Sequence, residues 1–308
     1  MRALNIAMLT LFCFLLLFTG IVSAEKQKII SEINEYGGKT VEVTRENGDR
    51  GFDEILKIIQ LSDRNGAAIK REIFYTDKFA REHGHNREID YYEDNGEKTH
   101  TEYFYPDDVA NEEGYYRQID YYDVNRKMTK EELFYTAEFT AERGFDRSMV
   151  YFNINGKKIR GEMFCTDTFA KEAGYGKAIE YYDYYGNRTK KEFFYTDEFV
   201  YENGFYRQVH YYDNKGQLSK REAFYADKAA NENGYDREIG YYDRNGKATK
   251  IKIFYTNKFA ENNGFNTVVI YYRDGTPAGI EKYIDKKLVG KSFVSSKRSP
   301  SPRNNRIR

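Results

Sequence analysis

The sequence predicts a mainly β protein with short helices, in which tandem 30-residue strand-turn-strand-helix repeats form an extended or curled antiparallel sheet, a solenoid-like architecture. Three observations predict it: an aromatic pair recurs every 30 residues, a glycine recurs with the same spacing, and each period holds two runs rich in β-branched and aromatic residues. The aromatic pairs are Tyr91-Tyr92, Tyr121-Tyr122, Tyr151-Phe152, Tyr181-Tyr182, Tyr211-Tyr212, Tyr241-Tyr242 and Tyr271-Tyr272.

Residues 1–24 have the anatomy of a secretory signal peptide. One basic residue, Arg2, precedes an apolar run, and the segment ends in the small residues Val22-Ser23-Ala24. This pattern predicts cleavage after Ala24; an uncleaved membrane anchor is the alternative, since the apolar stretch is nearly long enough to span a bilayer. We expect the mature protein to be secreted or periplasmic, or on the cell surface, without a membrane span after cleavage.

The two ends of the remaining chain differ from its body. Residues 25–60 contain a degenerate version of the unit and are expected to form an N-terminal capping repeat. Residues 61–285 form the predicted repeat domain. Residues 286–308 hold eight basic residues and no acidic one, with Ser-Pro twice, which predicts a disordered basic tail with possible contact to anionic polymers.

Each unit divides into three predicted elements. Residues 237–242 read as a strand, 243–247 as a tight turn, and 249–255 as a second strand. Residues 256–264 then read as a two-turn helix, because a Thr suited to N-capping opens it and a Gly suited to a left-handed conformation closes it. So short a helix needs the neighbouring sheet to be stable.

Two turns fit the Asp-x-Asn-Gly-Lys motif: a two-residue Asn-Gly loop, or a three-residue loop with Gly in the left-handed position and a bulge. Alternation favours the bulged loop, which places Ile239 and Tyr241 on one face with Thr249, Ile251 and Ile253. It also predicts two cross-strand pairs, Asp120 with Lys130 and Glu180 with Lys190. The recurrent Phe column falls on the polar side in this register; a second bulge would move it.

Composition argues against several functions. Lys plus Arg and Asp plus Glu both number 49, which argues against a nucleic-acid binder. Two Cys and four His in different columns leave no metal-ligand spacing. We therefore predict no catalytic residue, no metal, no cofactor and no enzymatic activity.

One row of tyrosines is a candidate for ligand binding. The second Tyr of each aromatic pair has polar neighbours, so it is expected to be more exposed than the first, and exposed rings could stack on sugars or bind a protein. Simple packing on the sheet is the alternative for any one of them. The row consists of Tyr92, Tyr122, Tyr182, Tyr212, Tyr242 and Tyr272.

Two charged columns accompany these rings. Arg recurs in one column and Glu in another, and ordinary cross-strand ion pairing explains both. The columns hold Arg87, Arg117, Arg147, Arg207 and Arg237, and Glu72, Glu102, Glu132, Glu162, Glu192 and Glu222.

The hairpin half of each unit, from Tyr211-Tyr212-Asp213-Asn214-Lys215-Gly216-Gln217-Leu218 to Phe224-Tyr225, resembles bacterial MORN-type repeats and the tyrosine-rich hairpins of cell-wall-binding repeats. The period here is longer, Trp is absent, and the helix segment has no counterpart in either family. The resemblance implies a binding or scaffolding role at the cell envelope and names no ligand.

These observations predict a secreted, non-catalytic repeat protein that acts as a binding scaffold for a protein or cell-surface partner. The alternative is a carbohydrate or cell-wall-binding module that uses the exposed Tyr row.

Overall fold

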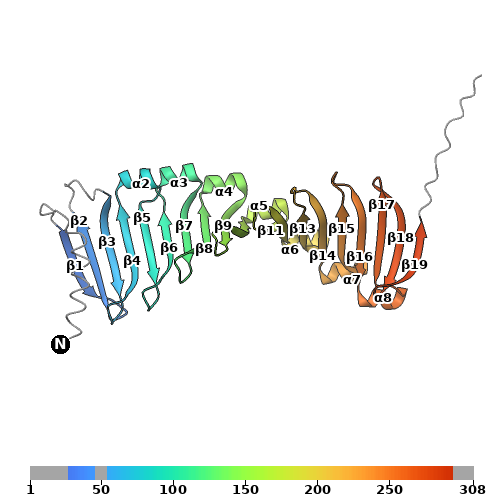
Figure 1. Cartoon of the computed structure of the whole chain (residues 1–308), viewed down its shortest axis with the longest axis horizontal. Coiled ribbons are helices and arrows are strands. Elements are labelled where there is room, and N and C mark those ends of the chain that lie inside the picture. The colour runs from blue at the N-terminus through green and yellow to red at the C-terminus, as the bar shows by residue number, and fades with distance from the viewer. Residues whose placement is uncertain (1–26, 46–53, 294–308) are drawn as a thin grey trace, which may run out of the picture. The chain divides into compact units, whose positions relative to one another are not determined.

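The computed structural model describes residues 27–45 and 54–293. The chain divides into two compact units, residues 1–158 and 159–308. Within each unit, successive strands pair antiparallel in chain order and form one layer (Figure 1). The predicted signal peptide, part of the predicted cap and most of the predicted tail lie outside the described residues.

In its described residues, the first unit carries three helices between its strands. Its elements are β1 (Gln27–Ile33), β2 (Lys39–Arg45), β3 (Ile55–Ser62), β4 (Ala68–Tyr75), α2 (Asp77–His83), β5 (Arg87–Tyr92), β6 (Lys98–Phe104), α3 (Asp107–Glu113), β7 (Tyr115–Tyr122), β8 (Met128–Tyr135), α4 (Ala137–Arg143) and β9 (Phe145–Phe152).

The second unit repeats the same order, and its last described elements are strands. Its elements are β10 (Lys158–Cys165), α5 (Asp167–Ala173), β11 (Tyr175–Tyr182), β12 (Arg188–Tyr195), α6 (Asp197–Asn203), β13 (Phe205–Tyr212), β14 (Leu218–Tyr225), α7 (Asp227–Asn233), β15 (Tyr235–Tyr242), β16 (Ala248–Tyr255), α8 (Asn257–Asn263), β17 (Thr267–Arg273), β18 (Thr276–Ile284) and β19 (Lys287–Phe293).

The predicted repeat fold is confirmed, and so is the bulged three-residue turn. In the β15–β16 hairpin, the Asp243 N–H donates to the Lys247 carbonyl at 2.9 Å, and the Gly246 N–H donates to the Asp243 carbonyl at 3.0 Å. Gly246 has φ +75°, the left-handed conformation that glycine adopts without strain. The Asp243 carboxylate accepts the N–H groups of Asn245 and Lys247, which explains why Asp opens the turn.

A second bulge follows the turn and reverses the predicted faces of the second strand. Tyr242 pairs with Ala248 and Tyr241 with Lys250, so Thr249 has no partner opposite it. Its hydroxyl instead donates to the Tyr241 carbonyl at 3.2 Å. The prediction that Tyr241 shares a face with Thr249 and Ile251 is therefore wrong, because one extra residue turns every later side chain of β16 over.

The same bulge corrects the two predicted cross-strand pairs. Asp120 lies opposite Glu131, and Glu180 lies opposite Lys191. Lys130 and Lys190 lie opposite tyrosines of the preceding strand instead. Phe254 of the recurrent Phe column consequently shares a face with Arg237, Ile239 and Tyr241 instead of Tyr242, while Lys250 and Lys252 remain beside it.

The short helices begin and end as predicted. In α8, the Thr256 hydroxyl accepts the Phe259 N–H, and Gly264 closes the helix with φ +72°. The Phe259 ring stacks on Tyr255 at 4.3 Å and contacts Phe265 edge-on at 5.8 Å. In each unit the helices follow one another along one rim of the sheet (Figure 1).

Neighbouring repeats meet through the capping glycines. A Cβ added to Gly234 would lie 2.5 Å from the Phe259 ring of the next helix, and one added to Gly114 would lie 2.6 Å from the Phe139 ring. The Gly234 carbonyl also accepts the Thr256 N–H of the next repeat at 2.9 Å. Glycine is therefore needed in this column for two reasons: it adopts the left-handed conformation that ends the helix, and its lack of a side chain leaves space for the neighbouring aromatic ring.

The C-terminal end differs from the prediction. The expected hairpin at Asp274-Gly275 is present, and both residues have positive φ. A further hairpin turns at Asp285-Lys286, where φ is again positive twice, and β19 follows inside the segment predicted to be a disordered tail. Two-residue turns with two positive φ values match strand twist, and Leu288 and Val289 give the segment strand character that a count of charges hides.

No helix among the described residues is long and apolar enough to cross a membrane.

Candidate functional site

The second bulge sorts side chains into two distinct faces of the sheet. The helix-side face contains Ile251, Ile253 and Tyr255, and the Tyr255 ring stacks on Phe259 of α8. The opposite face carries Arg237, Ile239 and Tyr241 of the first strand of that hairpin, facing Phe254, Lys252 and Lys250 of the second. We call this the aromatic–cation face, because three parallel rows of such residues cross the strands on it.

The first row alternates cations with phenylalanines. Arg207 lies 5.8 Å from the Phe194 ring centroid and 5.1 Å from that of Phe224, and Arg237 lies 5.2 Å from Phe224 and 5.3 Å from Phe254. Such contacts stabilise the cation by about 0.5–1 kcal/mol at exposed sites. The first unit repeats the alternation with Lys57, Phe74, Arg87, Phe104, Arg117, Phe134 and Arg147.

The second row alternates tyrosines with lysines, except that His100 and Arg160 occupy two of the lysine positions. The ammonium group of Lys190 lies 3.7 Å from the Tyr181 ring centroid, and that of Lys220 lies 3.7 Å from Tyr211. In the first unit, Lys130 lies 3.4 Å from Tyr121. Each lysine therefore lies over the ring of its cross-strand partner.

The middle row alternates aliphatic residues with glutamates. The Glu222 carboxylate forms ion pairs with Lys220 at 2.7 Å and Arg237 at 2.5 Å. Glu192 forms the same two kinds of ion pair with Lys190 and Arg207. The predicted ion pairing of the two charged columns is confirmed at Arg87–Glu72, Arg117–Glu102, Arg147–Glu132, Arg207–Glu192 and Arg237–Glu222.

The carboxylates of this row lie beneath the cations. The Glu222 side chain is 5% exposed, whereas that of Arg237 is 38% exposed. Burial alone would raise the pKa of Glu222, but hydrogen bonds from Lys220 and Arg237 outweigh it and lower the pKa. The face therefore hides its negative groups and presents its positive ones to solvent.

The predicted Tyr row lies on the helix-side face, and its members are half-buried rather than exposed. The rings lean back along their own strands: the Tyr92 hydroxyl donates to Asp90 at 3.1 Å, and the Tyr182 hydroxyl donates to Glu180 at 2.5 Å. The Tyr242 hydroxyl lies 2.9 Å from where a Cβ of Gly240 would be. The helix-side face of the first unit carries Tyr92 and Tyr122, and that of the second unit carries Tyr182, Tyr212, Tyr242 and Tyr272, each in a different hairpin.

Cations cover some of these rings. Lys98 lies 5.0 Å from the Tyr122 ring centroid, and Arg188 lies 4.3 Å from that of Tyr212. Burial, followed by hydrogen bonding to Glu180, raises the pKa of Tyr182 far above the ordinary tyrosine value. The row therefore offers partly covered rings, not free aromatic platforms.

A buried acid anchors the Tyr row near the start of the repeat domain. Asp90 is fully buried and accepts hydrogen bonds from Arg71 at 2.5 Å, Thr101 at 2.8 Å and Lys98 at 3.2 Å. Burial would raise the pKa of Asp90, but these three donors lower it. Because Arg71, Thr101 and Lys98 all donate to Asp90, we assign this cluster a structural role.

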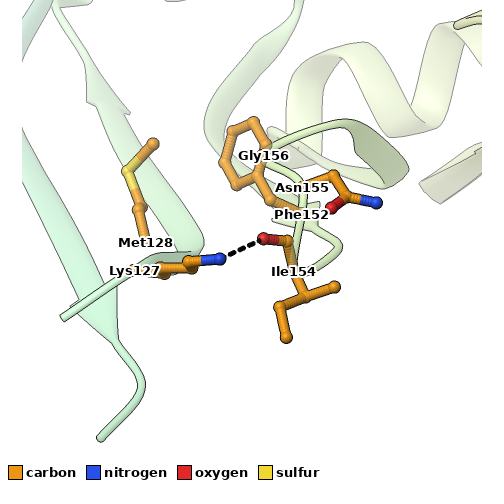
Figure 2. Close-up of a pocket in the computed structure, with 6 residues that line it drawn as sticks. All are labelled: Lys127, Met128, Phe152, Ile154, Asn155 and Gly156. Atoms are coloured by element: carbon orange, nitrogen blue, oxygen red, sulfur yellow. Dashed lines mark hydrogen bonds between the residues drawn. The ribbon is translucent and has the colours of Figure 1, made fainter. Parts of the chain in front are cut away.

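Hollows in the described surface are shallow and lie between repeated elements. One, of about 400 Å³, lies between the turns of two successive hairpins, where the Lys127 ammonium donates to the Ile154 carbonyl at 3.1 Å (Figure 2). Another, of about 570 Å³, lies beside Phe224, Arg237 and Phe254. Neither holds a nucleophile beside a base.

Among the described residues, one group of potential metal ligands comes together. Glu54, Glu82 and His83 place one ligand atom each within 4.8 Å of one another, and the last two residues are exposed. The His83 ring packs 4.2 Å from Phe79. Exposed acidic groups often gather without an ion, and nothing else marks this position as a site.

Sequence reasoning found both charged columns but missed that they flank aromatic rings. The signal was the recurrent Phe column, whose place on the polar side the single-bulge register left unexplained.

Comparisons with known proteins add no function. No family model and no curated protein matches the chain. A crystal structure of TcdB2–TccC3–TEV aligns with 88% of this chain at 13% identity, with a TM-score of 0.17, and this chain spans 15% of the length of that one. So low a TM-score supports no inference about fold or function.

Proposed function

We propose that the protein is a secreted, non-catalytic repeat scaffold whose aromatic–cation face binds a protein or another cell-surface partner. One observation supports this above all: the same three rows of side chains recur across successive hairpins on a face that the helices do not cover. The helix rings contact the other face, as Phe259 does through Tyr255. A uniform open surface of this kind suits binding over a large area.

The side chains of this face are ordered before any partner arrives. Arg207 is fixed by Glu192 at 2.5 Å and by the two rings beside it. Ordering a long side chain on binding costs about 0.5–1.5 kcal/mol, so this cost is already met in the free protein. Tyr and Arg are also enriched where binding energy concentrates in protein interfaces.

Lysine footprinting on the full chain tests the proposal. An envelope extract is passed over the immobilised protein, and lysine acetylation is compared with and without the retained partner. We expect protection at Lys190 and Lys220 on the aromatic–cation face. The turn lysines Lys157, Lys215 and Lys247 are the internal controls and should react equally in both states. A folded protein that retains no partner, or protection confined to the turns, would refute the scaffold.

A carbohydrate-binding module is the second candidate, because a half-buried tyrosine recurs on the helix-side face in six of the hairpins. It predicts that Tyr212→Ala and Tyr242→Ala weaken retention on polysaccharide or cell-wall matrices at an unchanged melting temperature. Unchanged retention, or a loss that accompanies unfolding, would count against it.

Export is proposed from the signal-like segment alone, which lies outside the described residues. Sequencing the N-terminus of protein recovered outside the cytoplasm should give Glu25 as the first residue. Uncleaved protein in the membrane fraction would favour the anchor alternative.

A further inference from the structure

The middle row of the aromatic–cation face departs from its alternation of aliphatic residues and glutamates at one place in the second unit. The middle row of the second unit has glutamate in the second strand of three successive repeats, at Glu162, Glu192 and Glu222, and lysine at the next equivalent position, Lys252. Lys252 lies between Ile239 of β15 and Val269 of β17. A positive charge therefore stands where each earlier repeat has a negative one.

Four cations lie near Glu222 at this position, while the next carboxylate of the row, Glu281, is paired with Lys291 at 2.8 Å. Lys220 and Arg237 both bind Glu222, at 2.7 Å and 2.5 Å. Lys250 lies 4.0 Å from the Tyr241 ring centroid, and among the described residues neither it nor Lys252 has a carboxylate within ion-pairing distance. We call Lys220, Arg237, Lys250 and Lys252 the lysine patch.

The overall charge balance of the chain conceals this concentration. The sequence has equal numbers of basic and acidic residues, but the four helices of the second unit hold eight carboxylates and three lysines. Acidic groups are therefore in excess along the helical rim, while the lysine patch lies on the open face. A local positive field of this kind attracts anionic partners despite a neutral total.

Two of the aromatic rings around the patch are covered by cations, whereas Tyr271, opposite Lys250, is 39% exposed and donates its hydroxyl to Glu281. Cations lie on the ring of Phe224 from both sides, at 5.1 and 5.2 Å, and Lys250 lies over Tyr241. Sugars and single-stranded bases bind such faces by stacking on open rings. With the Phe224 and Tyr241 rings covered and the Tyr271 ring exposed at its edge, the lysine patch favours a ligand recognised chiefly through its charges.

The spacing of the two unpaired lysines matches an extended polypeptide. Lys250 and Lys252 are two residues apart on β16, so their side chains lie on one face about 6.6 Å apart. Alternate side chains of any extended peptide project from one side at the same spacing. An acidic segment with Asp or Glu at every second residue can place successive carboxylates over Lys250 and Lys252.

We propose that the lysine patch is the docking point for an extended acidic segment of a protein partner, with carboxylates at alternate residues. This inference rests on the proposed scaffold function and specifies its partner.

Binding of a Glu-Thr-Glu-Thr-Glu-Thr peptide to the full chain tests this directly. The double variant Lys250→Gln with Lys252→Gln should weaken binding by about 5- to 30-fold, the effect of losing two exposed ion pairs. The matched control, Lys247→Gln with Lys258→Gln, removes the same charge from a turn and a helix and should leave affinity unchanged. Raised salt should weaken the wild-type complex.

A single variant separates binding from folding. K252E restores the residue type that the three earlier repeats have, and it gives Lys250 the partner that Glu222 gives Lys220. We expect its melting temperature to stay equal or rise while affinity for the acidic peptide falls at least as far as in the double variant. Retained affinity in K252E would overturn the proposal.

Three other results would also overturn it: equal losses in the matched control, no peptide binding at low salt, or tighter binding of hyaluronan or poly(dT) than of the peptide with the same dependence on Lys252. Failure here is distinguishable from failure of the scaffold. If Lys190 and Lys220 remain protected by an envelope partner while the acidic peptide does not bind, the scaffold stands and the acidic partner is wrong.

Discussion

At the residue scale, the capping glycines show how one position joins two repeats. Gly234 needs a left-handed backbone, with φ +81°, and its missing side chain leaves room for Phe259. Gly264 has the same backbone conformation, and nothing lies within 4 Å of its added Cβ. The two positions therefore separate backbone strain from contact between repeats.

Gly264→Ala should cost about 1–2 kcal/mol, the penalty for a left-handed alanine. Gly234→Ala should cost more, because the Phe259 ring must also move. Urea unfolding of both variants measures the difference. Equal losses would show that the glycine column serves only to end helices.

His210 provides a pH-dependent test at the same scale. Burial, followed by the nearby cations Arg221, Lys191 and Arg188, lowers its pKa to about 4. Between about pH 6.5 and 4, His210 is therefore protonated in the unfolded chain but mostly neutral in the folded one. The free energy of unfolding consequently falls as pH falls through this window.

His210→Gln should reduce the loss of stability over that window, and urea midpoints measured at pH 7, 5.5 and 4.5 check it. The other buried histidines, His85 and His100, also have lowered pKa values, so the comparison is with wild type at each pH. An identical pH profile in both proteins would contradict the assignment.

At the element scale, the helices are short, uniform and unequally capped. Thr256 caps α8 through the Phe259 N–H, whereas α7 begins after Ala226 and has no side-chain cap. Ala226 nevertheless has φ −69° and ψ 154°, close to the conformation of Thr256. The backbone is thus already arranged for a cap that the residue does not supply.

Ala226→Thr should therefore stabilise the protein by about 0.5–1 kcal/mol, by adding one hydrogen bond to an orphan N–H. The reverse change, Thr256→Ala, should destabilise it by about 1 kcal/mol. Thermal unfolding of the two variants checks both signs. A neutral result at both positions would mean that the sheet alone determines where these helices begin.

The sequence predicted the elements better than their faces. Thr, Gly and the turn motif each report a local conformation, so the helices and hairpin turns could be placed from single positions. The bulge position has a weaker marker: a Thr or Ser whose hydroxyl donates to a tyrosine carbonyl recurs there, but Ile69 also occupies it. This bulge places Tyr241 and Phe254 on the same face. The aromatic–cation face therefore could not be located until the register was known.

The end of the repeat domain shows the same limit. Lys286 and Lys287 made the segment look like the start of a charged tail, yet Lys286 occupies a left-handed turn position and Leu288 pairs with Tyr283. Pairing with an existing sheet edge stabilises a strand that composition alone does not predict.

At the scale of the whole molecule, each repeat is completed by its neighbours. A helix such as α7 packs on the strand that follows it, and Gly204 lies against Ala229 of the next repeat. The free energy of unfolding is then the sum of small contributions from single repeats and larger contributions from the interfaces between them, as in other repeat proteins. The proposed binding face depends on the same principle, since its ion pairs and ring contacts join adjacent strands.

The most direct test is the folding of one excised repeat, residues 205–234, beside the full chain. We predict that circular dichroism and amide exchange show the excised repeat to be unfolded in water. The full chain should be folded, with the amides of its β-strands strongly protected from exchange. A compact, cooperatively unfolding single repeat would contradict the account, because it would show that the interfaces between repeats are not what stabilises the fold.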